Sequence, residues 1–398
     1  MLEQALVEIQ KGWTHWHDGK VPQAQIVAEQ ILQTTPADQE ALHLQALTQL
    51  VQGRYAAALN TFSKLDTSYT QYPQVGGAMV EAYLHLNDLE RAVQLTRKLN
   101  LDSVAYLESR LAKPFRVKAD DTSIIPFSDD PKISASFWPG IAGRINGQDV
   151  NIRLDTGGSF LILEKQRAEQ LGIALIHQGK STHAASQVTS WKGIADEMQL
   201  GGGPCFEHVP VVIMESLGTH AIFGTNILEP FLATMDYPNS RFILTPRHRK
   251  ELYKAHLDLL PKNQRKLPFY MWGDHYMFAK GGFNNIDDLT FFFDSGLIAL
   301  TEIDGKLKQA AFTVSKQKLT SWGFSESQLE KTSFLPTQYP LSVAGLHMAN
   351  TLIWYDENLP HDRNFGGVRM DGLISHAFLS NYSWTINFDK YEYLFGIE

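Results

Sequence analysis

The hydrophobic and polar positions follow different patterns on either side of residue 113. Up to that residue, apolar positions recur with a fixed long period, and only five of the chain's 29 Gly and three of its 17 Pro residues occur there. Beyond it, short apolar runs alternate with turn residues, and most of the Phe residues are found there. Because Gly and Pro interrupt helices, this change predicts a helical domain over 1–113 followed by a strand-rich region.

The helical segment repeats itself with a period of 34 residues. Two sets of positions carry this spacing, the first suited to a helix-ending turn and the second to close helix packing: Gly19, Gly53 and Asn87, and Ala24, Ala58 and Ala92. The period and the residue types resemble tetratricopeptide repeats. The resemblance predicts stacked helical pairs with a closing helix over 101–112. They would form either a packing platform or a groove for a peptide or partner protein.

The strand-rich region contains one pattern twice. The apolar runs 150–154 and 289–293 each end at an Asp, and residues 222–244 align without a gap with residues 373–395. Between the copies, a charged stretch without strand pattern is expected to contain a helix. The sequence therefore predicts a first half over 114–246, a connecting segment over 247–266 and a second half over 267–398.

Each half presents the same short motif at the end of its apolar run. The motifs are Asp155-Thr156-Gly157 and Asp294-Ser295-Gly296. A carboxylate at a strand end, followed by a Gly that permits a tight turn, is typical of a functional loop. One such motif is weak evidence, because it occurs by chance in many turns. Two of them in similar surroundings indicate a site built from one Asp of each half.

The paired motifs resemble the aspartic proteases, and each half is similar to the retroviral type, the retropepsin-like half. The resemblance implies an all-β double barrel with pseudo-two-fold symmetry, formed by one chain as in pepsin. It implies that Asp155 and Asp294 are the catalytic pair and that one shared proton lets them activate water and the scissile carbonyl. The same resemblance gives four residues supporting roles in the loops: Thr156, Gly157, Ser295 and Gly296.

The polar stretch 182–193 stands where this family carries a mobile flap. Ser186 and Trp191 are the flap candidates, although a Trp in a strand-rich protein also suits a core position. The pepsin-type hydroxyl residue after each motif is replaced here by Gly158 and Leu297. Because that hydroxyl would lower the pKa of the pair, we expect a less acidic pH optimum than that of pepsin.

Two further positions differ between the halves. Gly224 of the first half corresponds to Ser375, and Asp236 corresponds to Asn387. We interpret both as structural positions that have drifted in a duplicated copy.

The composition of the chain limits the partners, cofactors and cellular locations that we expect. A net charge of −8 gives no electrostatic reason to expect nucleic acid or an anionic membrane as partner. Cys205 is the single cysteine, which excludes an intrachain disulfide and a cysteine metal cluster. No metal or other cofactor is expected. The acidic start without an apolar core favours a cytoplasmic location, or a periplasmic or secreted one if a signal peptide has been removed.

These observations favour an aspartic endopeptidase whose helical repeats recruit a protein or peptide substrate or a partner. A monomer with an internal pseudo-dimer is expected. An alternative from another class is a catalytically silent peptide-binding or scaffold protein with a protease-like domain. A third reading requires two chains and leaves the second half as a spacer.

Overall fold

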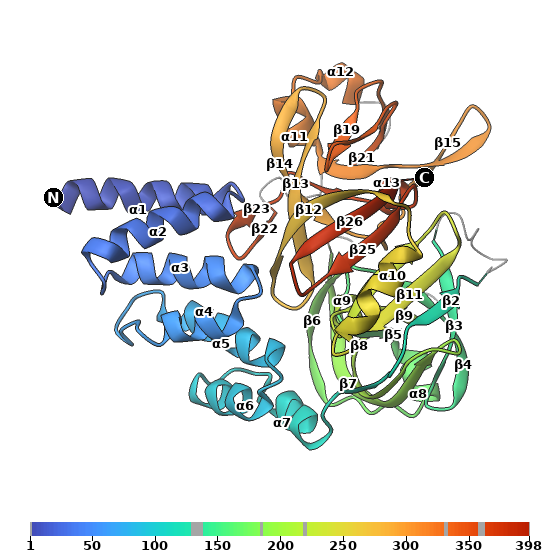
Figure 1. Ribbon diagram of the computed structural model, residues 1–398, viewed down its shortest axis with the longest axis horizontal. Coiled ribbons are helices and arrows are strands. Elements are labelled where there is room, and N and C mark those ends of the chain that lie inside the picture. Colours follow the sequence, from blue (N-terminus) through green and yellow to red (C-terminus); the bar gives the residue numbers. More distant parts are fainter. Residues whose placement is uncertain are drawn as a thin grey trace. The chain divides into compact units, whose positions relative to one another are not determined.

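The computed structural model describes residues 2–128, 138–183, 186–217, 221–329, 333–356 and 363–397. Seven helices come first and β-strands dominate the rest (Figure 1). By their contacts the residues form two units. One contains residues 1–112, 270–276 and 364–370, and the other contains residues 113–269, 277–363 and 371–398. None of the helices in the described ranges combines the length and the apolar character needed to cross a membrane.

The helical repeats pack consecutive helices against each other. Their bounds are α1 Leu2–His17, α2 Val21–Thr34, α3 Gln39–Val51, α4 Tyr55–Phe62, α5 Tyr72–His85, α6 Leu89–Lys98 and α7 Val104–Ala112. The turns after α1, α3 and α5 contain the residues with the 34-residue spacing, and all three have a left-handed backbone: Gly19 (φ 66°), Gly53 (φ 73°) and Asn87 (φ 56°). The Ala residues with the same spacing are fully buried: Ala24, Ala58 and Ala92. The expected turn and packing roles are therefore confirmed.

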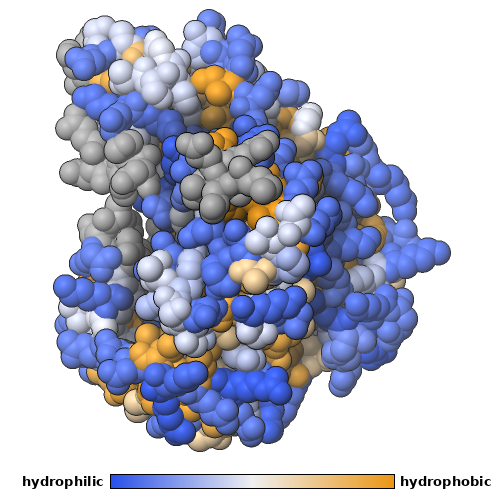
Figure 2. Space-filling model, turned by 90° about the vertical axis from the view of Figure 1, so that its left-hand side faces the viewer, coloured by the Kyte–Doolittle hydropathy of each residue, from blue (hydrophilic) through white to orange (hydrophobic). Residues whose placement is uncertain are grey.

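The exterior of the molecule is mixed. On the face drawn in Figure 2 most of the surface is hydrophilic, and apolar side chains show in separate patches. Five of the exposed large apolar side chains in the described residues belong to the helical segment: Val7, Ile26, Leu86, Leu101 and Leu111. Isolated apolar side chains of this kind are normal on a globular protein.

The first β-rich half lies between residues 116 and 246. Its elements are β1 Arg116–Lys118, β2 Ser123–Pro126, β3 Gly140–Ile145, β4 Gln148–Leu154, β5 Leu161–Glu164, α8 Lys165–Gln170, β6 His177–His183, β7 Ser186–Leu200, β8 Cys205–Met214, β9 Ala221–Phe223, α9 Thr225–Leu228, β10 Phe231–Asp236 and β11 Arg241–Pro246. The β3–β4 hairpin turns at Asn146-Gly147, where both residues have positive φ.

Six strands of the first half close into a barrel. Going round it, β8 pairs with β5, β5 with β9, β9 with β4, β4 with β3, β3 with β7, and β7 returns to β8. The β4–β9 pairing is parallel and runs up to Leu154 and Phe223. Apolar side chains such as Ile152, Phe206 and Val211 fill the interior and are fully buried. The barrel therefore fixes the end of β4, the point from which the first motif projects.

The second half has a comparable order of elements. After the connecting 3-10 turn (Lys250–Leu252) and α10 (Tyr253–Asp258) come β12 Asn263–Trp272, β13 Tyr276–Phe283, β14 Ile286–Phe293, β15 Leu300–Ile303, β16 Lys306–Gln309, β17 Phe312–Ser315, α11 Lys316–Ser321, α12 Glu326–Leu329, β18 Phe334–Pro336, β19 Leu341–Val343, β20 Leu346–Met348, β21 Leu352–Asp356, β22 Asn364–Phe365, β23 Val368–Arg369, β24 Gly372–Ile374, α13 His376–Leu379, β25 Ser383–Asn387 and β26 Glu392–Ile397. The helix expected in the connecting segment is confirmed.

Six neighbouring antiparallel strands of a 14-stranded sheet join the two halves. Their order is β12-β26-β25-β10-β11-β2, so β10 of the first half lies beside β25 of the second. Asp236 at the end of β10 is fully buried, and its carboxylate accepts from Ser383 Oγ of β25 (2.6 Å) and from Arg241 Nε (2.6 Å). In the second half, Asn387 instead accepts the backbone N–H of Asp389 (3.1 Å) and closes a turn. Asp236 and Asn387, which correspond in sequence, therefore have different structural roles.

Candidate active site

Both motifs follow a strand that is held by a short parallel partner. Residues Ile152–Leu154 pair with Ala221–Phe223, and residues Phe291–Phe293 pair with Gly372–Ile374. The backbone N–H of Asp155 donates to Phe223 O (3.0 Å), and that of Asp294 donates to Ile374 O (3.0 Å). The two halves therefore present their Asp residues from the same local backbone arrangement.

The hydroxyl residues of the motifs bond across the boundary between the halves. The backbone N–H of Thr156 donates to Ser295 Oγ (3.0 Å), and the backbone N–H of Ser295 donates to Thr156 Oγ1 (3.0 Å). Thr156 Oγ1 also donates to Phe293 O (2.9 Å). Thr156 is 2% exposed and Ser295 is 1% exposed, so these bonds form away from water. This reciprocal pairing brings together two loops that are distant in sequence.

The Gly of each motif lies against the Asp of the other half. A Cβ on Gly157 would lie 2.6 Å from Asp294 Cγ, and a Cβ on Gly296 would overlap the Asp155 carboxylate. Each Gly also donates its backbone N–H to the Asp of its own loop, over 2.7 Å to Asp155 Oδ1 and 2.9 Å to Asp294 Oδ1. The absence of a side chain at 157 and 296 is therefore what allows the two carboxyl groups to approach.

The surroundings of Asp294 change its pKa. Burial raises the pKa of Asp294 well above its ordinary value, and the Asp155 carboxylate and a hydrogen bond with it raise the pKa further. The backbone N–H groups of Gly296 and Leu297 act in the opposite direction. Both effects favour the protonated form of Asp294 next to the Asp155 carboxylate. Such a pair has both a proton acceptor and a proton donor for a bound water and an electrophile.

The flap candidates lie on the hairpin formed by β6 and β7. Ser186 starts β7 and pairs with His183 across the turn, and its side chain is outside the described part of the structure. Trp191 lies farther along β7, where the strand also pairs with Ile213 of β8. Its half-buried ring has Lys165 Nζ 4.6 Å from the centroid. The structure thus places Ser186 next to the hairpin turn. It places Trp191 at the other end of the hairpin, where β7 joins β8 in the barrel.

Two contributors to the first loop were missed by reasoning from the sequence. Thr225 Oγ1 donates to Thr156 O (3.0 Å), and Trp138 Nε1 donates to Leu154 O (2.9 Å). Thr225 could have been found, because it directly follows Gly224 in the segment that aligns with residues 373–395. Trp138 carried no local signal. The adjacent Arg153 is fully buried and donates to Trp138 O, so Trp138 covers both a charge and the strand end.

The structure explains the exchange of Gly224 for Ser375, which we had interpreted as drift. A Cβ on Gly224 would overlap the carbonyl of Gly158, so only Gly fits there. Ser375 starts α13, where its hydroxyl accepts the N–H of Ala377 (3.1 Å) and donates to Ala310 O (2.5 Å). The Ser therefore makes a helix cap that Gly could not make.

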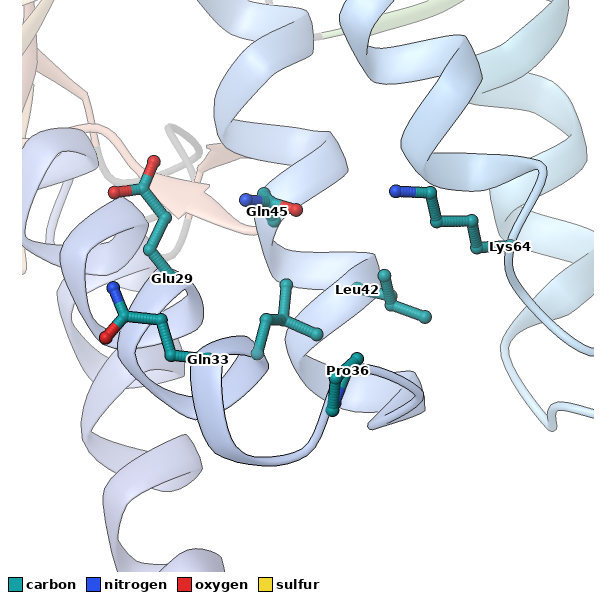
Figure 3. Close-up of a pocket in the computed structure, with 7 residues that line it drawn as sticks. Glu29, Gln33, Pro36, Leu42, Gln45 and Lys64 are labelled. Carbon is teal, nitrogen blue, oxygen red and sulfur yellow. The ribbon is translucent and has the colours of Figure 1, made fainter.

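A separate pocket lies in the helical repeats. It has a volume of about 380 Å³ and lies between α2, α3 and the end of α4 (Figure 3). Its lining is mainly polar with opposite charges at two edges: Glu29, Leu32, Gln33, Pro36, Leu42, Gln45 and Lys64.

Comparisons with known proteins agree with this geometry in part of the chain. Residues 141–230 match the family described as "gag-polyprotein putative aspartyl protease". A retropepsin-like aspartic protease from Rickettsia conorii is 20% identical over 33% of this chain and 92% of its own, with a TM-score of 0.23. An aspartic proteinase from Irpex lacteus is 7% identical over 69% of this chain and 97% of its own, with a TM-score of 0.43.

No curated protein matches the chain. The family match includes the first motif and α9, the segment in which Thr225 supports the Asp155 loop. The segment 141–230, which holds the first of the two paired loops, is therefore similar to an aspartyl protease family.

Proposed function

We propose that this protein is an aspartic endopeptidase that hydrolyses peptide bonds with a water held between Asp155 and Asp294. The observation that carries the proposal is the reciprocal pair of hydrogen bonds between Thr156 and Ser295, which brings the two Asp loops together within one chain. The match of residues 141–230 to an aspartyl protease family supports the same reading for the first loop.

The proposed mechanism needs one proton on the pair. The ionised carboxyl removes a proton from water, and the oxygen of that water bonds to the scissile carbonyl carbon. The protonated carboxyl donates its proton to the carbonyl oxygen, so a neutral tetrahedral intermediate forms. In the collapse, the carboxyl that took the water proton gives it to the leaving nitrogen, and the other carboxylate takes a proton from one hydroxyl as the carbonyl re-forms. The C–N bond breaks, and the pair again holds one proton. The raised pKa of Asp294 supports a shared proton, without assigning the acid to one residue.

Around this pair, we propose that the supporting residues keep their roles from the family. Thr156 and Ser295 hold the loops, and Gly157 and Gly296 give the carboxyls room. The β6–β7 hairpin with Ser186 and Trp191 covers the substrate.

The helical repeats would recruit a protein partner or substrate. Stacked helical pairs commonly present an extended binding surface, and the pocket between α2 and α3 offers both charges and amide groups to a peptide. Glu29 and Lys64 would read charges of opposite sign on such a peptide (Figure 3). A double substitution of these two residues should weaken partner binding while cleavage of a short peptide stays unchanged.

Cleavage of an unstructured protein tests the enzymatic proposal. We expect that Asp155→Asn and Asp294→Asn each lower kcat by more than about 10³-fold, because either change removes the shared proton's second site. Both changes conserve shape, so the unfolding transition should stay in place. Pepstatin, a mimic of the tetrahedral intermediate, should inhibit the unmodified protein.

A catalytically silent peptide binder is the competing proposal. It would bind unstructured protein without cleaving it, and the two Asn variants would bind as tightly as the unmodified protein. Cleavage that persists in both Asn variants would instead point to a contaminating protease and would count against our assignment.

A further inference from the structure

Two short segments of the second half contact the helical repeats. Residues 270–276 contain the end of β12, the turn after it and the first residue of β13, and residues 364–370 contain the β22–β23 hairpin. Both group with residues 1–112, although by sequence they belong to the half that carries Asp294. None of the described residues of the first half groups with the helices in this way. The two halves are therefore unequal in their relation to the repeats.

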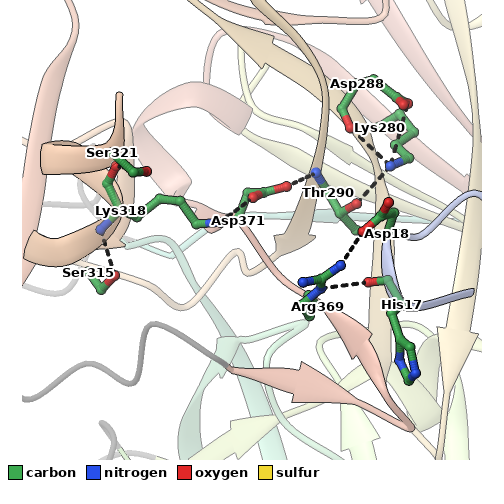
Figure 4. Close-up of polar contacts among 10 residues, drawn as sticks. All are labelled: His17, Asp18, Lys280, Asp288, Thr290, Ser315, Lys318, Ser321, Arg369 and Asp371. Carbon is green, nitrogen blue, oxygen red and sulfur yellow. Dashed lines mark hydrogen bonds and ion pairs between the residues drawn. The ribbon is translucent and has the colours of Figure 1, made fainter. Parts of the chain in front are cut away.

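The end of α1 holds the β22–β23 hairpin. Trp16 Nε1 donates to Gly366 O (2.9 Å), and His17 Nδ1 lies 2.7 Å from Gly367 O. Arg369 forms an ion pair with the Asp18 carboxylate and donates to His17 O (3.4 Å) (Figure 4). Trp16 is fully buried, so its indole is committed to this contact and to the core. The end of α1 therefore contacts both backbone carbonyls of the Gly-Gly turn and the charged side chain of Arg369 beside it.

The shape of the hairpin depends on its two Gly residues. Gly366 and Gly367 have φ values of 58° and 89°, which side chains strongly disfavour. A Cβ on Gly367 would lie 3.2 Å from Trp16 Nε1 and 3.4 Å from the His17 ring. A Cβ on Gly366 would overlap the ring of Trp272, the last residue of β12, which belongs to the other contacting segment. A larger residue would therefore push the hairpin away from α1.

The second contact lies on α5. His85 Nε2 is 2.9 Å from Gly273 O in the turn after β12. The His85 ring is stacked on Tyr55, with 4.3 Å between the centroids and 1° between the planes. The helices thus contact a third backbone carbonyl, in the turn before β13.

A short continuous segment leads from the hairpin to the candidate site. Asp371 is separated from Arg369 by one residue, and its carboxylate accepts the N–H of Thr290 (2.8 Å) and pairs with Lys318 (2.7 Å) (Figure 4). Its own N–H donates to Thr290 O (2.7 Å). The next residues form β24 beside the last residues of β14, and Ile374 O accepts the N–H of Asp294.

We infer that the helical repeats position the Asp294 loop through the segment 364–374, in addition to any role in recruiting partners. In this view Trp16, Gly367 and Asp371 are positioning residues. They hold the chain that leads into β24. Through Ile374 O, they thereby hold the backbone of Asp294. The catalytic part of the inference rests on the proposed function.

The test compares two Gly→Leu substitutions in the full chain. Gly367→Leu adds a side chain at positive φ against α1. Gly305→Leu does the same in the β15–β16 turn, at a φ of 69° and with nothing within 4 Å of its Cβ. Hydrogen exchange of the amides over 286–297 and 150–157 is measured by mass spectrometry, and kcat and KM are measured on a peptide.

We expect Gly367→Leu to speed exchange over 286–297 at least about tenfold, because the N–H of Asp294 loses its fixed acceptor. Residues 150–157 should keep their protection, and kcat should fall at least about tenfold while KM changes less than about threefold. Gly305→Leu should leave both segments and kcat unchanged.

Asp371 supplies a second, independent variant pair. Asp371→Ala removes both the acceptor for Thr290 and the partner of Lys318, and it should lower kcat as Gly367→Leu does. Asp371→Asn keeps one acceptor oxygen and should restore most of the loss. Unchanged exchange over 286–297 in Gly367→Leu, or equal loosening of both Asp loops, would overturn the inference. If the unmodified protein cleaves nothing, the proposed function fails, and the exchange result still decides whether the helices fix the loop.

Discussion

At the scale of single residues, small residues control the space around each motif. The motif Gly is the same in both halves, whereas the residue before the following short helix differs. Gly157 and Gly296 admit the carboxylate of the opposite loop, whereas Gly224 admits the carbonyl of Gly158. Ser375 occupies the position of Gly224 in the second half without such a clash and caps a helix. The motif residues could be predicted because their pattern is local. The reason for the Gly–Ser difference could not, because it depends on a backbone contact 66 residues away in sequence.

This asymmetry predicts that the two residues cannot be exchanged. Gly224→Ser should lower the free energy of unfolding by more than about 2 kcal/mol, because its Cβ overlaps the Gly158 carbonyl. Ser375→Gly should cost only about 1 kcal/mol or less, since it loses a cap hydrogen bond and gains no clash. Urea denaturation of both variants measures the difference, and equal losses would contradict it.

The Asp pair also predicts the pH dependence of cleavage. The pKa of Asp294 is raised, first by burial and then by the Asp155 carboxylate, so the pair keeps its single proton to higher pH. On acidification, activity falls when the second carboxyl also becomes protonated. We therefore expect kcat/KM to peak above the ordinary Asp pKa of about 3.9. A profile that peaks below about pH 3 would show that this environment does not set the titration.

At the scale of elements, α10 ties together the strands of the shared sheet. His256 of α10 is fully buried, and its ring nitrogens lie 2.7 Å from Thr234 Oγ1 of β10 and 2.8 Å from Thr245 Oγ1 of β11. The helix itself could be predicted from its charged, strand-free sequence. The inward direction of His256 could not be predicted, because a single His between Ala255 and Leu257 does not indicate which strands it will contact.

The burial of His256 predicts a loss of stability in mild acid. Burial lowers its pKa from 6.5 to about 4, so the unfolded chain binds the proton more tightly. The free energy of unfolding is therefore unaffected by protonation of His256 above about pH 6.5. It falls by about 3 kcal/mol at most as the pH is lowered from about 6.5 to about 4. His256→Gln, which keeps hydrogen bonds to the two Thr hydroxyls, should flatten this part of the stability curve.

Urea denaturation at pH 7 and pH 4.5 measures that change. The exposed His248, close in sequence, provides the matched control as His248→Gln, and it should leave the difference between the two pH values as in the unmodified protein. His43 has its pKa lowered to about 4 by burial as well, so part of the acid sensitivity should remain in His256→Gln. An unchanged curve in His256→Gln would mean that the sheet tolerates the charged ring.

At the scale of the whole molecule, one chain supplies both loops and the sheet that joins them. The division into a helical segment and two similar β-rich halves could be predicted, because the periods of 34 residues and the repeated motif are visible in the sequence. The assignment of residues 270–276 and 364–370 to the helical unit could not. It depends on a Gly-Gly turn fitting against Trp16 and Trp272, and turns of this composition occur in many unrelated places.

The internal pairing of the halves predicts that a single chain is active. The N–H groups and hydroxyls of Thr156 and Ser295 satisfy one another, and β10 pairs with β25 in the same chain, so a second copy has no loop to replace. We therefore expect cleavage to be proportional to protein concentration and to sediment with the monomer. Mixing Asp155→Asn with Asp294→Asn sharpens the test. If chains exchanged halves freely in an equal mixture, about a quarter of all sites would regain two Asp residues, whereas intramolecular sites stay inactive in the mixture. A site made from two copies of the first half would instead leave Asp294→Asn fully active by itself.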